Sequence, residues 1–402
     1  MSFQQGLSGL NGAAKALDAI GNNVSNASTS GFKSSSAQFA DVFASSLTGG
    51  GGTQVGIGTT INAVKQSFTQ GNISVTNNPL DVAINGGGFF RMSDNGAISY
   101  TRNGQFLIDK DGYVVNSAAQ RLTGYAATAG GVIVPSTPSE IRVDTSDLTP
   151  QATALSEVGL NLDSRQTVPA TAFAVTDPTS YNASTSMSVY DTLGNSHVMG
   201  IYFVKTATAN QWSLYTNLDG GAPSAATTVT FTAAGQLSGF TPVAQSFAVT
   251  TGATSPMTYN LDLTGSTQFG SSFGVNRIAQ DGYTSGRLSG VAISPDGIMQ
   301  GRYSNGQSRN LSQIVLVNFN NPNGLQPLGG NQWAESSASG QPIIGAPASG
   351  TLGVLQSAAI EESNVDLTAE LVSMITAQRN YQANAQTIKT QDQVLQTLVN
   401  LR

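Results

Sequence analysis

Residues 3–24 read FQQGLSGLNGAAKALDAIGNNV, and residues 371–398 read LVSMITAQRNYQANAQTIKTQDQVLQTL. In both stretches apolar side chains recur in steps of three or four, which places them on one stripe of a helix. The stripes comprise Phe3, Leu7, Leu10, Ala14, Leu17, Ile20 and Val24, and then Leu371, Met374, Tyr381, Ala385, Ile388, Leu395 and Leu398. Neither predicted helix has a core beside it in the sequence. Each stripe must therefore be buried against the other end of the chain or against another molecule, and assembly becomes the first hypothesis.

The residues around the C-terminal stripe indicate where its helix begins. Asn364 or Asp366 can cap the helix, and Glu370 suits the positive end of the helix dipole. Glutamine outnumbers Lys and Glu on the polar face, which carries Gln378, Gln382, Gln386, Gln393 and Gln396. Because a solvated coiled-coil face usually carries ions, we expect this face also to be covered in the working state.

The composition is unusually poor in charge. Of the 402 residues only 10% are charged, against about 25% in typical soluble domains. A surface of Ser, Thr, Asn, Gln and Gly is easier to desolvate, which suits a subunit contacted on many sides, although an ordinary low-charge extracellular protein fits as well. The net charge of -6 argues against nucleic acid as a partner.

The chain has no cysteine, which excludes disulfides, thiol catalysis and thiolate metal sites. The first twelve residues lack the basic start and continuous apolar core of a cleavable secretory signal. No stretch approaches the roughly 20 apolar residues of a membrane span, so no membrane insertion is expected.

After the first helix the sequence changes character. Residues 21–26, GNNVSN, tolerate left-handed backbone and bond their own main chain, which ends a helix. We expect Asn22, Asn23, Asn26 and Gly31 to set the joint between helix and connector. Residues 25–72, which include a Gly-rich run at 49–58, are predicted to be an extended linking region together with 358–364.

From about residue 73 the apolar period becomes two, which indicates strands. Turn dipeptides follow at Asn95-Gly96, Asn103-Gly104, Asp111-Gly112, Asp296-Gly297 and Asn305-Gly306, and predict β-hairpins. Residues 314–317, IVLV, predict a strand buried on both faces.

The predicted fold class is multidomain α+β, with paired terminal helices in a coiled-coil-like arrangement and nested, discontinuous all-β domains. Residues 146–285 are richer in Ala and Thr, with strands expected at 187–190, 198–204 and 212–215, and are predicted to be an outer β domain inserted into a loop of the first. The predicted division is 1–24 with 365–402 for helices, 25–72 with 358–364 for the linking region, 73–145 with 286–357 for the first β domain, and 146–285 for the insert.

Three blocks of the sequence resemble a known family. Residues 21–33, GNNVSNASTSGFK, are similar to the N-terminal motif of bacterial flagellar rod, hook and hook-associated proteins. Residues 80–90, LDVAINGGGFF, resemble that family's second block. Residues 362–367, 377–386 and 388–390 match its C-terminal block. Three motifs in the family's order, over roughly the outer third of the chain, are specific for these axial proteins.

Within this family the length, the single inserted β domain and the ending LQTLVNLR at 395–402 are similar to hook proteins. That resemblance implies a structural subunit that polymerises into a curved, flexible tube transmitting torque from rod to filament. It implies export through the flagellar type III apparatus without a cleavable signal, and an extracellular location. By resemblance the partners are other copies of the chain, the distal rod protein, the hook cap protein and the hook-filament junction protein. A distal rod or hook-associated protein is the alternative.

Enzymatic and metal-binding readings find little support. His197 is the only histidine, which excludes a His-based metal site, and the Gly-rich run lacks the Gly-Lys-Ser/Thr of a phosphate loop. Asp109-Lys110-Asp111-Gly112 hints at a calcium loop, but the further ligands are absent and a hairpin turn is expected. No carboxylates are paired for acid and base catalysis. We expect no catalytic residue, cofactor or metal.

Two other hypotheses stay open. The N-terminal helix could lie on a membrane, but its polar face offers only Lys15 as a cation. A secreted β-rich adhesin would also show low charge and Thr-rich strands, but should assemble and bind without its terminal helices. The residues expected to pack in assembly are Leu7, Leu10, Leu17, Ile20, Leu371, Ile375, Tyr381, Ile388, Leu395 and Leu398, although the same residues could close an intramolecular hairpin.

Overall fold

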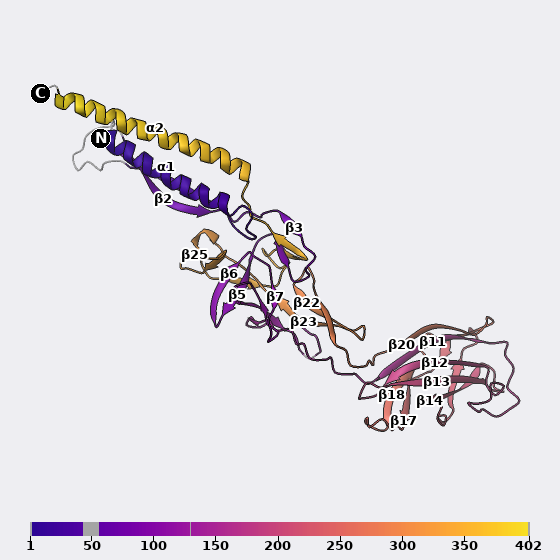
Figure 1. The fold of residues 1–402 in the computed structure, drawn as a ribbon. Coiled ribbons are helices and arrows are strands. Elements are labelled where there is room, and N and C mark those ends of the chain that lie inside the picture. Colours follow the sequence, from indigo (N-terminus) through magenta and orange to yellow (C-terminus); the bar gives the residue numbers. More distant parts are fainter. Residues whose placement is uncertain (1, 43–55, 129, 401–402) are drawn as a thin grey trace. The chain divides into compact units, whose positions relative to one another are not determined.

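Two antiparallel helices carry the ends of the chain in the computed structural model, which describes residues 2–42, 56–128 and 130–400. Helix α1 (Ser2–Ser25) and helix α2 (Leu367–Asn400) lie side by side (Figure 1). Near one end of the pair Gly6 lies against Ile388, and near the other Asn23 Nδ2 donates to Glu370 Oε1 at 3.0 Å. The predicted pairing of the terminal helices is confirmed.

Helix α2 begins where Asp366 caps it. Oδ1 of Asp366 accepts hydrogen bonds from the backbone N–H groups of Thr368 (2.9 Å) and Ala369 (3.1 Å), which lack partners inside the helix. Asn364, the other predicted cap, instead accepts from the Ser34 N–H at 2.7 Å through its own Oδ1. Asp366 therefore fixes the start of α2, and Asn364 attaches the preceding segment to the connector.

The connector after α1 is not simply extended, contrary to the expectation for residues 25–72. Strands β1 (Ser35–Val42) and β2 (Gly58–Gln66) pair antiparallel, and both contact α1. Alternation of apolar and polar residues is weak in both strands, so the sequence pattern did not reveal them. Most of the Gly-rich run lies outside the described residues, which omit 43–55.

The chain forms two compact units. Unit 1 contains residues 1–144, 290–302 and 308–402, and unit 2 contains residues 145–289 and 303–307. The helices and most of the first β region belong to unit 1. The finer predicted division into four parts stays a prediction.

The largest sheet has thirteen strands, and its main path runs β21-β22-β23-β9-β5-β6-β26-β25. Its strands are β5 (Phe89–Asp94), β6 (Ala97–Thr101), β7 (Leu107–Ile108), β8 (Val114–Val115), β9 (Arg121–Ala126), β10 (Ser139–Glu140), β21 (Leu288–Ile293), β22 (Ile298–Tyr303), β23 (Ser308–Ile314), β24 (Leu316–Asn318), β25 (Gln326–Gly329), β26 (Gln332–Ala334) and β27 (Ile343–Gly345). A 3-10 turn (Pro322–Gly324) precedes β25.

Two small strand pairs join distant parts of the sequence within unit 1. Strand β3 (Ile73–Val75) pairs with β29 (Ala359–Glu361), and β4 (Val82–Asn85) pairs with β28 (Val354–Ser357). Both pairs are antiparallel. They bring the segment that follows the connector against the segment that leads into α2.

The predicted buried strand at 314–317 is confirmed, since all four side chains are fully buried. It passes from pairing with β9 through Ile314 to pairing with β5 and β27 through Leu316, with Val315 at the break. The hairpin turns at Asn95-Gly96 and Asp111-Gly112 are also confirmed, the second closing β7 onto β8. Residues 109–112 thus form the expected hairpin turn between β7 and β8.

The predicted hairpin at Asn103-Gly104 is wrong. Strands β6 and β7 on either side of it pair with other strands, not with each other. The Gly104 carbonyl accepts from the Val82 N–H at 2.9 Å, and an added Cβ at Gly104 would lie 1.7 Å from the Val82 carbonyl oxygen. This glycine therefore serves a close approach between two chain segments, which a turn dipeptide cannot reveal.

Unit 2 is built from two five-stranded sheets whose side chains share one core. The first sheet contains β12 (Ala183–Tyr190), β13 (Ser196–Lys205), β14 (Gln211–Leu218), β15 (Thr227–Phe231) and β16 (Leu237–Ser238). The second contains β11 (Leu155–Asp163), β17 (Val243–Phe247), β18 (Met257–Asp262), β19 (Thr267–Phe269) and β20 (Gly274–Gln280). The three strands predicted here, at 187–190, 198–204 and 212–215, are confirmed within β12, β13 and β14.

The predicted α+β multidomain class is confirmed.

His197 is buried between two carboxylates in unit 2. Its Nδ1 lies 2.6 Å from Asp219 Oδ2, and its Nε2 lies 3.3 Å from Asp191 Oδ2. The Asp191 carboxylate also accepts from the Thr251 hydroxyl at 2.6 Å and from Asn195 Nδ2 at 2.9 Å. The only histidine of the chain, on β13, thus links the turn before β13, through Asp191, to the residue that follows β14, Asp219.

The free energy of unfolding of unit 2 is expected to fall as pH rises above about 6.5, the pKa of an unfolded histidine. Burial lowers the pKa of His197, but its hydrogen bonds to Asp219 and Asp191 outweigh burial, so the folded pKa is raised. The stabilisation is therefore complete below the unfolded pKa and is lost as pH rises through the folded pKa. Urea unfolding at several pH values, followed by Trp212 fluorescence in a Trp333→Phe chain, measures it.

The matched variant is His197→Asn, in which this alkaline loss of stability should disappear. For Asp191, burial raises the pKa, but the hydrogen bonds from Thr251 and Asn195 lower it on balance. Its contribution is therefore lost only at acid pH, which separates the two effects. An unchanged alkaline slope in the His197→Asn chain would contradict the assignment.

Candidate assembly site

Glycines on α1 form the closest contacts between the two helices. A Cβ built on Gly6 would lie 3.1 Å from Ile388 Cγ1, and one built on Gly9 would lie 2.6 Å from Asn384 Oδ1. Small residues at such steps let two helix backbones approach closely. The part of the seam that these glycines form was missed by the sequence reasoning, which followed the large apolar residues alone. The signal was present as Gly6, Gly9 and Gly12 at intervals of three.

The predicted assembly residues of α1 differ in exposure. Leu7 is exposed, whereas Leu10, Leu17 and Ile20 are half-buried. Among the described members of the set on α2, Ile388 is half-buried and lies beside Gly6. The exposed members of the set on α2 are Leu371, Ile375, Tyr381 and Leu395. Leu398 lies in α2, but its side chain is outside the described part of the chain. The structure thus brings the two helices together and leaves much of the predicted set open to solvent.

A groove runs between α1, α2 and the β1–β2 pair, with a volume of about 460 Å³. We call it the small-residue groove. It is lined by Gly9, Gly12, Ala13 and Ala16 of α1, by Phe39 and Thr59 of the strand pair, and by Ala377, Asn380, Ala383 and Asn384 of α2. None of these residues is charged. The groove therefore offers an apolar floor to a visiting apolar side chain.

Asn23 is the residue that ties the end of α1 to the connector. Its side chain is buried and forms a two-way bond with Ser35, accepting from the Ser35 N–H (2.9 Å) and donating to the Ser35 carbonyl (2.8 Å). It also donates to Glu370 Oε1 on α2 at 3.0 Å. A single amide thus joins α1, β1 and α2. The role of Asn23 in the joint between helix and connector stays a prediction.

Asn23→Ala is expected to lower the free energy of unfolding of unit 1 by about 1–3 kcal/mol, because it leaves the polar groups of Ser35 unpaired. Urea unfolding followed by Trp333 fluorescence in a Trp212→Phe chain measures the change. The control is Asn22→Ala, since Asn22 is exposed and surface substitutions usually change stability by less than about 0.5 kcal/mol. Equal losses in both variants would contradict the role of Asn23.

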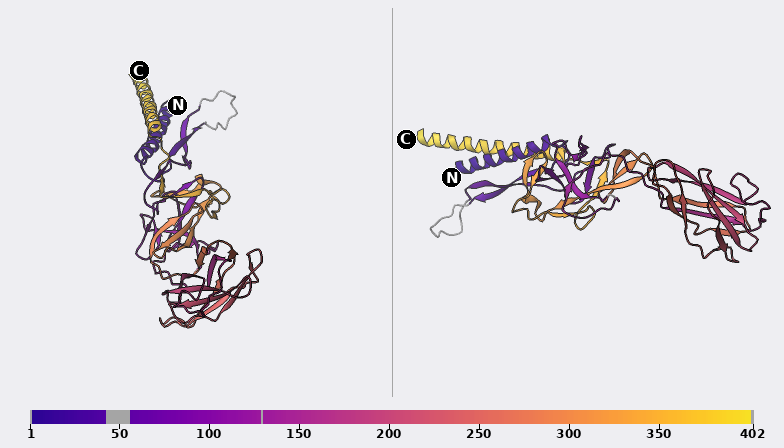
Figure 2. Two further views of the ribbon diagram at one scale, coloured as in Figure 1. Left: turned by 90° about the vertical axis from the view of Figure 1, so that its right-hand side faces the viewer. Right: turned by 90° about the horizontal axis from the view of Figure 1, so that it is seen from below.

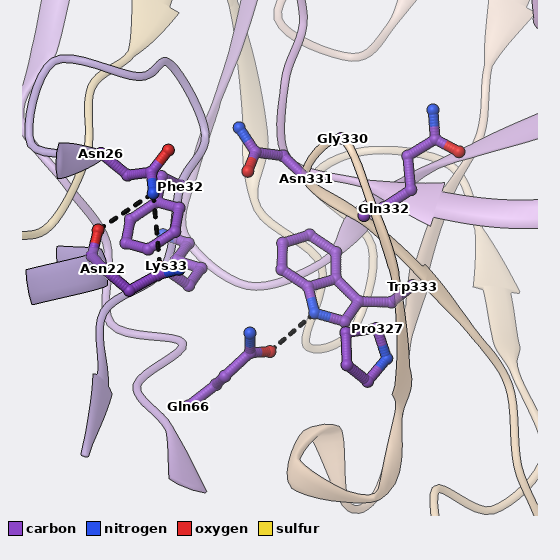
Figure 3. A pocket seen from close by; sticks show the side chains of 11 residues that line it. Asn22, Asn26, Phe32, Lys33, Gln66, Pro327, Gly330, Asn331, Gln332 and Trp333 are labelled. Atoms are coloured by element: carbon purple, nitrogen blue, oxygen red, sulfur yellow. Dashed lines mark hydrogen bonds between the residues drawn. The ribbon is translucent and has the colours of Figure 1, made fainter. Parts of the chain in front are cut away.

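Two further predicted joint residues, Asn22 and Asn26, line a hollow of about 300 Å³ (Figure 3). Asn22 and Asn26 stand on one side with Phe32, and Trp333 stands on the other. Asn26 Nδ2 donates to the Asn22 carbonyl at 2.9 Å, and Trp333 Nε1 donates to Gln66 Oε1 at 2.7 Å. Residues from the β25–β26 hairpin therefore face the joint across this hollow.

Gly31 places the connector against the first β region. Its φ is +71°, a conformation that favours glycine, and an added Cβ would lie 2.7 Å from the backbone nitrogen of Asn103. Its N–H donates to the Glu361 carbonyl at 2.8 Å. The positive φ and the close approach of the Asn103 backbone both favour glycine at this position.

Lys33, two residues after Gly31, meets two other buried charged side chains, Arg102 and Glu361. Lys33 Nζ lies 2.6 Å from Glu361 Oε1 and donates to the Thr69 carbonyl at 2.7 Å. Arg102 Nη1 lies 3.4 Å from Glu361 Oε2, and its Nη2 donates to the Gly86 carbonyl at 2.8 Å. The side chains of Lys33 and Glu361 are fully buried, and that of Arg102 is nearly so. We call Lys33, Arg102 and Glu361 the charge triad.

The charge triad joins three separate parts of the sequence, namely the connector, the segment after β6 and strand β29. Burial lowers the pKa of Lys33, although the Glu361 carboxylate raises it in part, and burial likewise lowers the pKa of Arg102. Glu361 is thus the single anion facing two cations. The sequence reasoning quoted Lys33 within a motif but assigned the triad no role. The missed signal was a charged residue within a motif of a chain that has few charges.

No helix among the described residues is long and apolar enough to cross a membrane. Likewise, within those residues no three His, Asp or Glu side chains are grouped to hold a metal ion.

Models of flagellar protein families match four parts of the chain. Residues 3–33 match the flagella basal body rod protein family, and residues 83–147 match the flagellar hook protein FlgE/F/G D1 domain. Residues 161–283 match the flagellar basal body protein FlaE D2 domain. Residues 356–401 match the C-terminal family of the flagellar basal body rod FlgEFG proteins. The matches extend from the first helix to the last.

Relatives are similar over the full length. The chain is 44% identical to the flagellar hook protein FlgE of Salmonella typhimurium and 43% identical to that of Escherichia coli K12, with all of each chain covered. The FlgE of Borreliella burgdorferi is 33% identical, over all of this chain and 99% of that protein. A crystal structure of the Helicobacter pylori flagellar hook protein FlgE2 shares the fold, with a TM-score of 0.53 and 14% identity over 72% of this chain and 100% of that one. The chain therefore belongs to the flagellar hook protein FlgE family.

Proposed function

We propose that this hook subunit polymerises with copies of itself through its terminal helices to form the hook, the extracellular joint of the flagellum. The observation that carries the proposal is the row of large apolar side chains left open on the helices. Leu371 is 45% exposed, Ile375 is 51% exposed and Leu395 is 50% exposed. Leu371 and Ile375 are four residues apart and so lie on one face of α2, and exposed apolar surface of this kind marks an interaction site. Burying one such leucine contributes about 1.5–3 kcal/mol, repeated at every subunit of a polymer.

Resemblance to the hook protein family suggests further partners. We propose that the ends of the hook contact the distal rod protein, the hook cap protein and the hook-filament junction protein, and that the chain is exported through the flagellar type III apparatus. A chain without cysteine supports this route, because no disulfide has to form after export. Pull-down of the assembled chain with each purified partner tests these contacts one at a time, and a partner that fails to bind is removed from the proposal.

Electron microscopy of the purified full chain, concentrated under mild salting-out, tests the central proposal. Tubes are the expected result. A chain that stays monomeric under these conditions while circular dichroism shows ordered helices would contradict it, because the helical seam would then serve only to close the monomer.

We further propose that unit 2 permits neighbouring subunits to slide while the hook bends and transmits torque. Ion pairs in this unit lie within the chain, as between Arg165 and Asp163, Arg277 and Glu157, and Arg287 and Asp147. The arginine of each pair is at least 63% exposed, so the pairs contribute little, and we infer that sliding breaks few ionic contacts between subunits.

The curvature fluctuations of hook polymers are therefore expected to be unchanged between about 0.15 M and 1 M salt, although the Debye length falls from about 8 Å to 3 Å. Electron microscopy of polymers frozen at both salt concentrations measures these fluctuations. Stiff polymers at low salt that loosen at high salt would show that ion pairs between subunits dominate.

A further inference from the structure

Helix α2 is longer than the helix it packs against. Gly6 lies beside Ile388, and α1 has only residues 2–5 before Gly6, whereas α2 continues through residues 389–400. Figure 2 shows α2 running past the start of α1. We call residues 392–400 the C-terminal overhang. Nine helical residues span about 13 Å.

The C-terminal overhang carries apolar side chains that have no cover within the described chain. Val394 is 52% exposed, Leu395 is 50% exposed and Val399 is 74% exposed. Leu395 and Val399 are four residues apart and therefore lie on one face of the helix. Asp392 is the only charged residue of this segment. The overhang thus presents an apolar ridge rather than a solvated helix end.

The small-residue groove has the complementary properties. The floor of the groove is formed by α1 from Gly9 to Ala16, which is about 11 Å at the helical rise. The α1 residues that line it are glycines and alanines, so none of their side chains is larger than a methyl group. Phe39 and Ala377 in its walls can contact an apolar side chain that enters the groove. No lining residue carries a charge. A ridge of Val and Leu side chains therefore fits this groove without desolvating any ion.

We propose that the C-terminal overhang of one copy docks in the small-residue groove of a second copy. An overhang cannot reach the groove of its own chain, because α2 both carries the overhang and forms one wall of the groove. Each copy offers one ridge and one groove on different surfaces, so the contact is head-to-tail and propagates as an open polymer. The inference rests on the proposed polymerisation and adds which surfaces meet.

Cysteine cross-linking is suited to the test because the chain has no cysteine of its own. A chain with Ala16→Cys and a second chain with Val399→Cys are mixed in equal amounts, polymerised, oxidised mildly and run on a non-reducing gel. A disulfide requires Cα atoms about 4.4–6.8 Å apart, so a heterodimer band reports direct contact. The matched control replaces Val399→Cys with Val372→Cys, because Val372 is also an exposed valine (60% against 74% for Val399) but lies near the other end of α2.

The expected result is a heterodimer band in polymers of the Ala16→Cys and Val399→Cys mixture that is lost in monomers, in the control mixture and on reduction. Polymers without this band, or with an equal band in the control, overturn the inference and leave the proposed function intact. A disulfide formed within one monomeric chain carrying both substitutions also overturns it. Failure of the unsubstituted chain to polymerise overturns the proposed function and the inference together.

Hydrogen exchange of the unsubstituted chain gives a second measurement that does not depend on the variants. The amides of residues 9–16 and of residues 392–399 are expected to become slower together on polymerisation. Slowing at only one of the two segments, or at neither, overturns the docking of overhang in groove.

Discussion

Replacing Leu395 with Asp is expected to abolish tube formation while leaving the subunit folded. In the isolated chain this side chain is half exposed, so a carboxylate there remains solvated and removes little packing. In a polymer the same carboxylate must be desolvated at each subunit contact, where burial of an unpaired charge is strongly unfavourable. The effect is therefore multiplied along the polymer and should appear as a loss of tubes in electron microscopy.

Leu395→Arg separates desolvation from the helix dipole. A positive charge near a helix C-terminus is favourable and a negative one is unfavourable, so the two variants have opposite effects on α2 itself. Both are nevertheless expected to block polymerisation, because either charge must be buried. Leu395→Met is the matched control and should form tubes, since it retains an apolar side chain of similar size.

Leu10→Asp is expected to block polymerisation as well, but Leu10 is half-buried and its loss also loosens α1. For this reason Leu395 carries the sharper test. Normal tubes from Leu395→Asp and Leu395→Arg chains would contradict assembly through α2. Helical content and unfolding midpoint of each variant must match those of the parent for the comparison to hold.

Glu361→Gln is expected to lower the free energy of unfolding of unit 1 by about 3–5 kcal/mol, as does breaking a buried ion pair from one side. The substitution leaves Lys33 and Arg102 buried with no counter-charge. It also weakens the acceptor for the Gly71 N–H, which lies 2.9 Å from Oε1. Urea unfolding followed by Trp333 fluorescence in a Trp212→Phe chain measures this loss.

Lys33→Met should be milder than Glu361→Gln, because it leaves one cation, Arg102, facing one anion. Lys15→Met is the surface control, since the Lys15–Asp18 pair is exposed and such pairs contribute about 0–1 kcal/mol. Equal losses for Lys33→Met and Glu361→Gln would show that the pair, and not the balance of charge in the triad, determines stability. A loss no larger than that of Lys15→Met would contradict a structural role for the triad.

Local features of the fold could be predicted where one residue or one short pattern decides the outcome. The helices α1 and α2, the fully buried run at 314–317 and the Asp111-Gly112 hairpin follow from spacing and turn chemistry, and the structure has each of them. Asn103-Gly104 has the same turn chemistry but forms no hairpin, because its glycine admits the Val82 carbonyl instead. The outcome at such a dipeptide depends on which distant segment packs against it.

In the candidate assembly site, individual residues could likewise be predicted from the sequence, but their contacts could not. The joint residues Asn23 and Gly31 were predicted from left-handed and self-bonding residue types, but their partners Ser35, Glu370 and Asn103 were not. Strands β1 and β2 were missed because neither shows a clear alternation. The charge triad was missed because Lys33, Arg102 and Glu361 are far apart in the chain and because charged residues are usually exposed, so nothing in the sequence indicated that they are buried.

The sequence by itself determined that two terminal helices would need partners, that the middle of the chain would be β-structured, and that the residues would resemble axial flagellar proteins. Periodicity and short motifs are local properties, so one chain read in order suffices for them. Only the tertiary structure decided that glycines bring α1 close to α2, that Glu361 faces both Lys33 and Arg102, and that α2 ends in an uncovered ridge. These features depend on the relative register of segments hundreds of residues apart, which packing of the whole core sets and no local pattern contains.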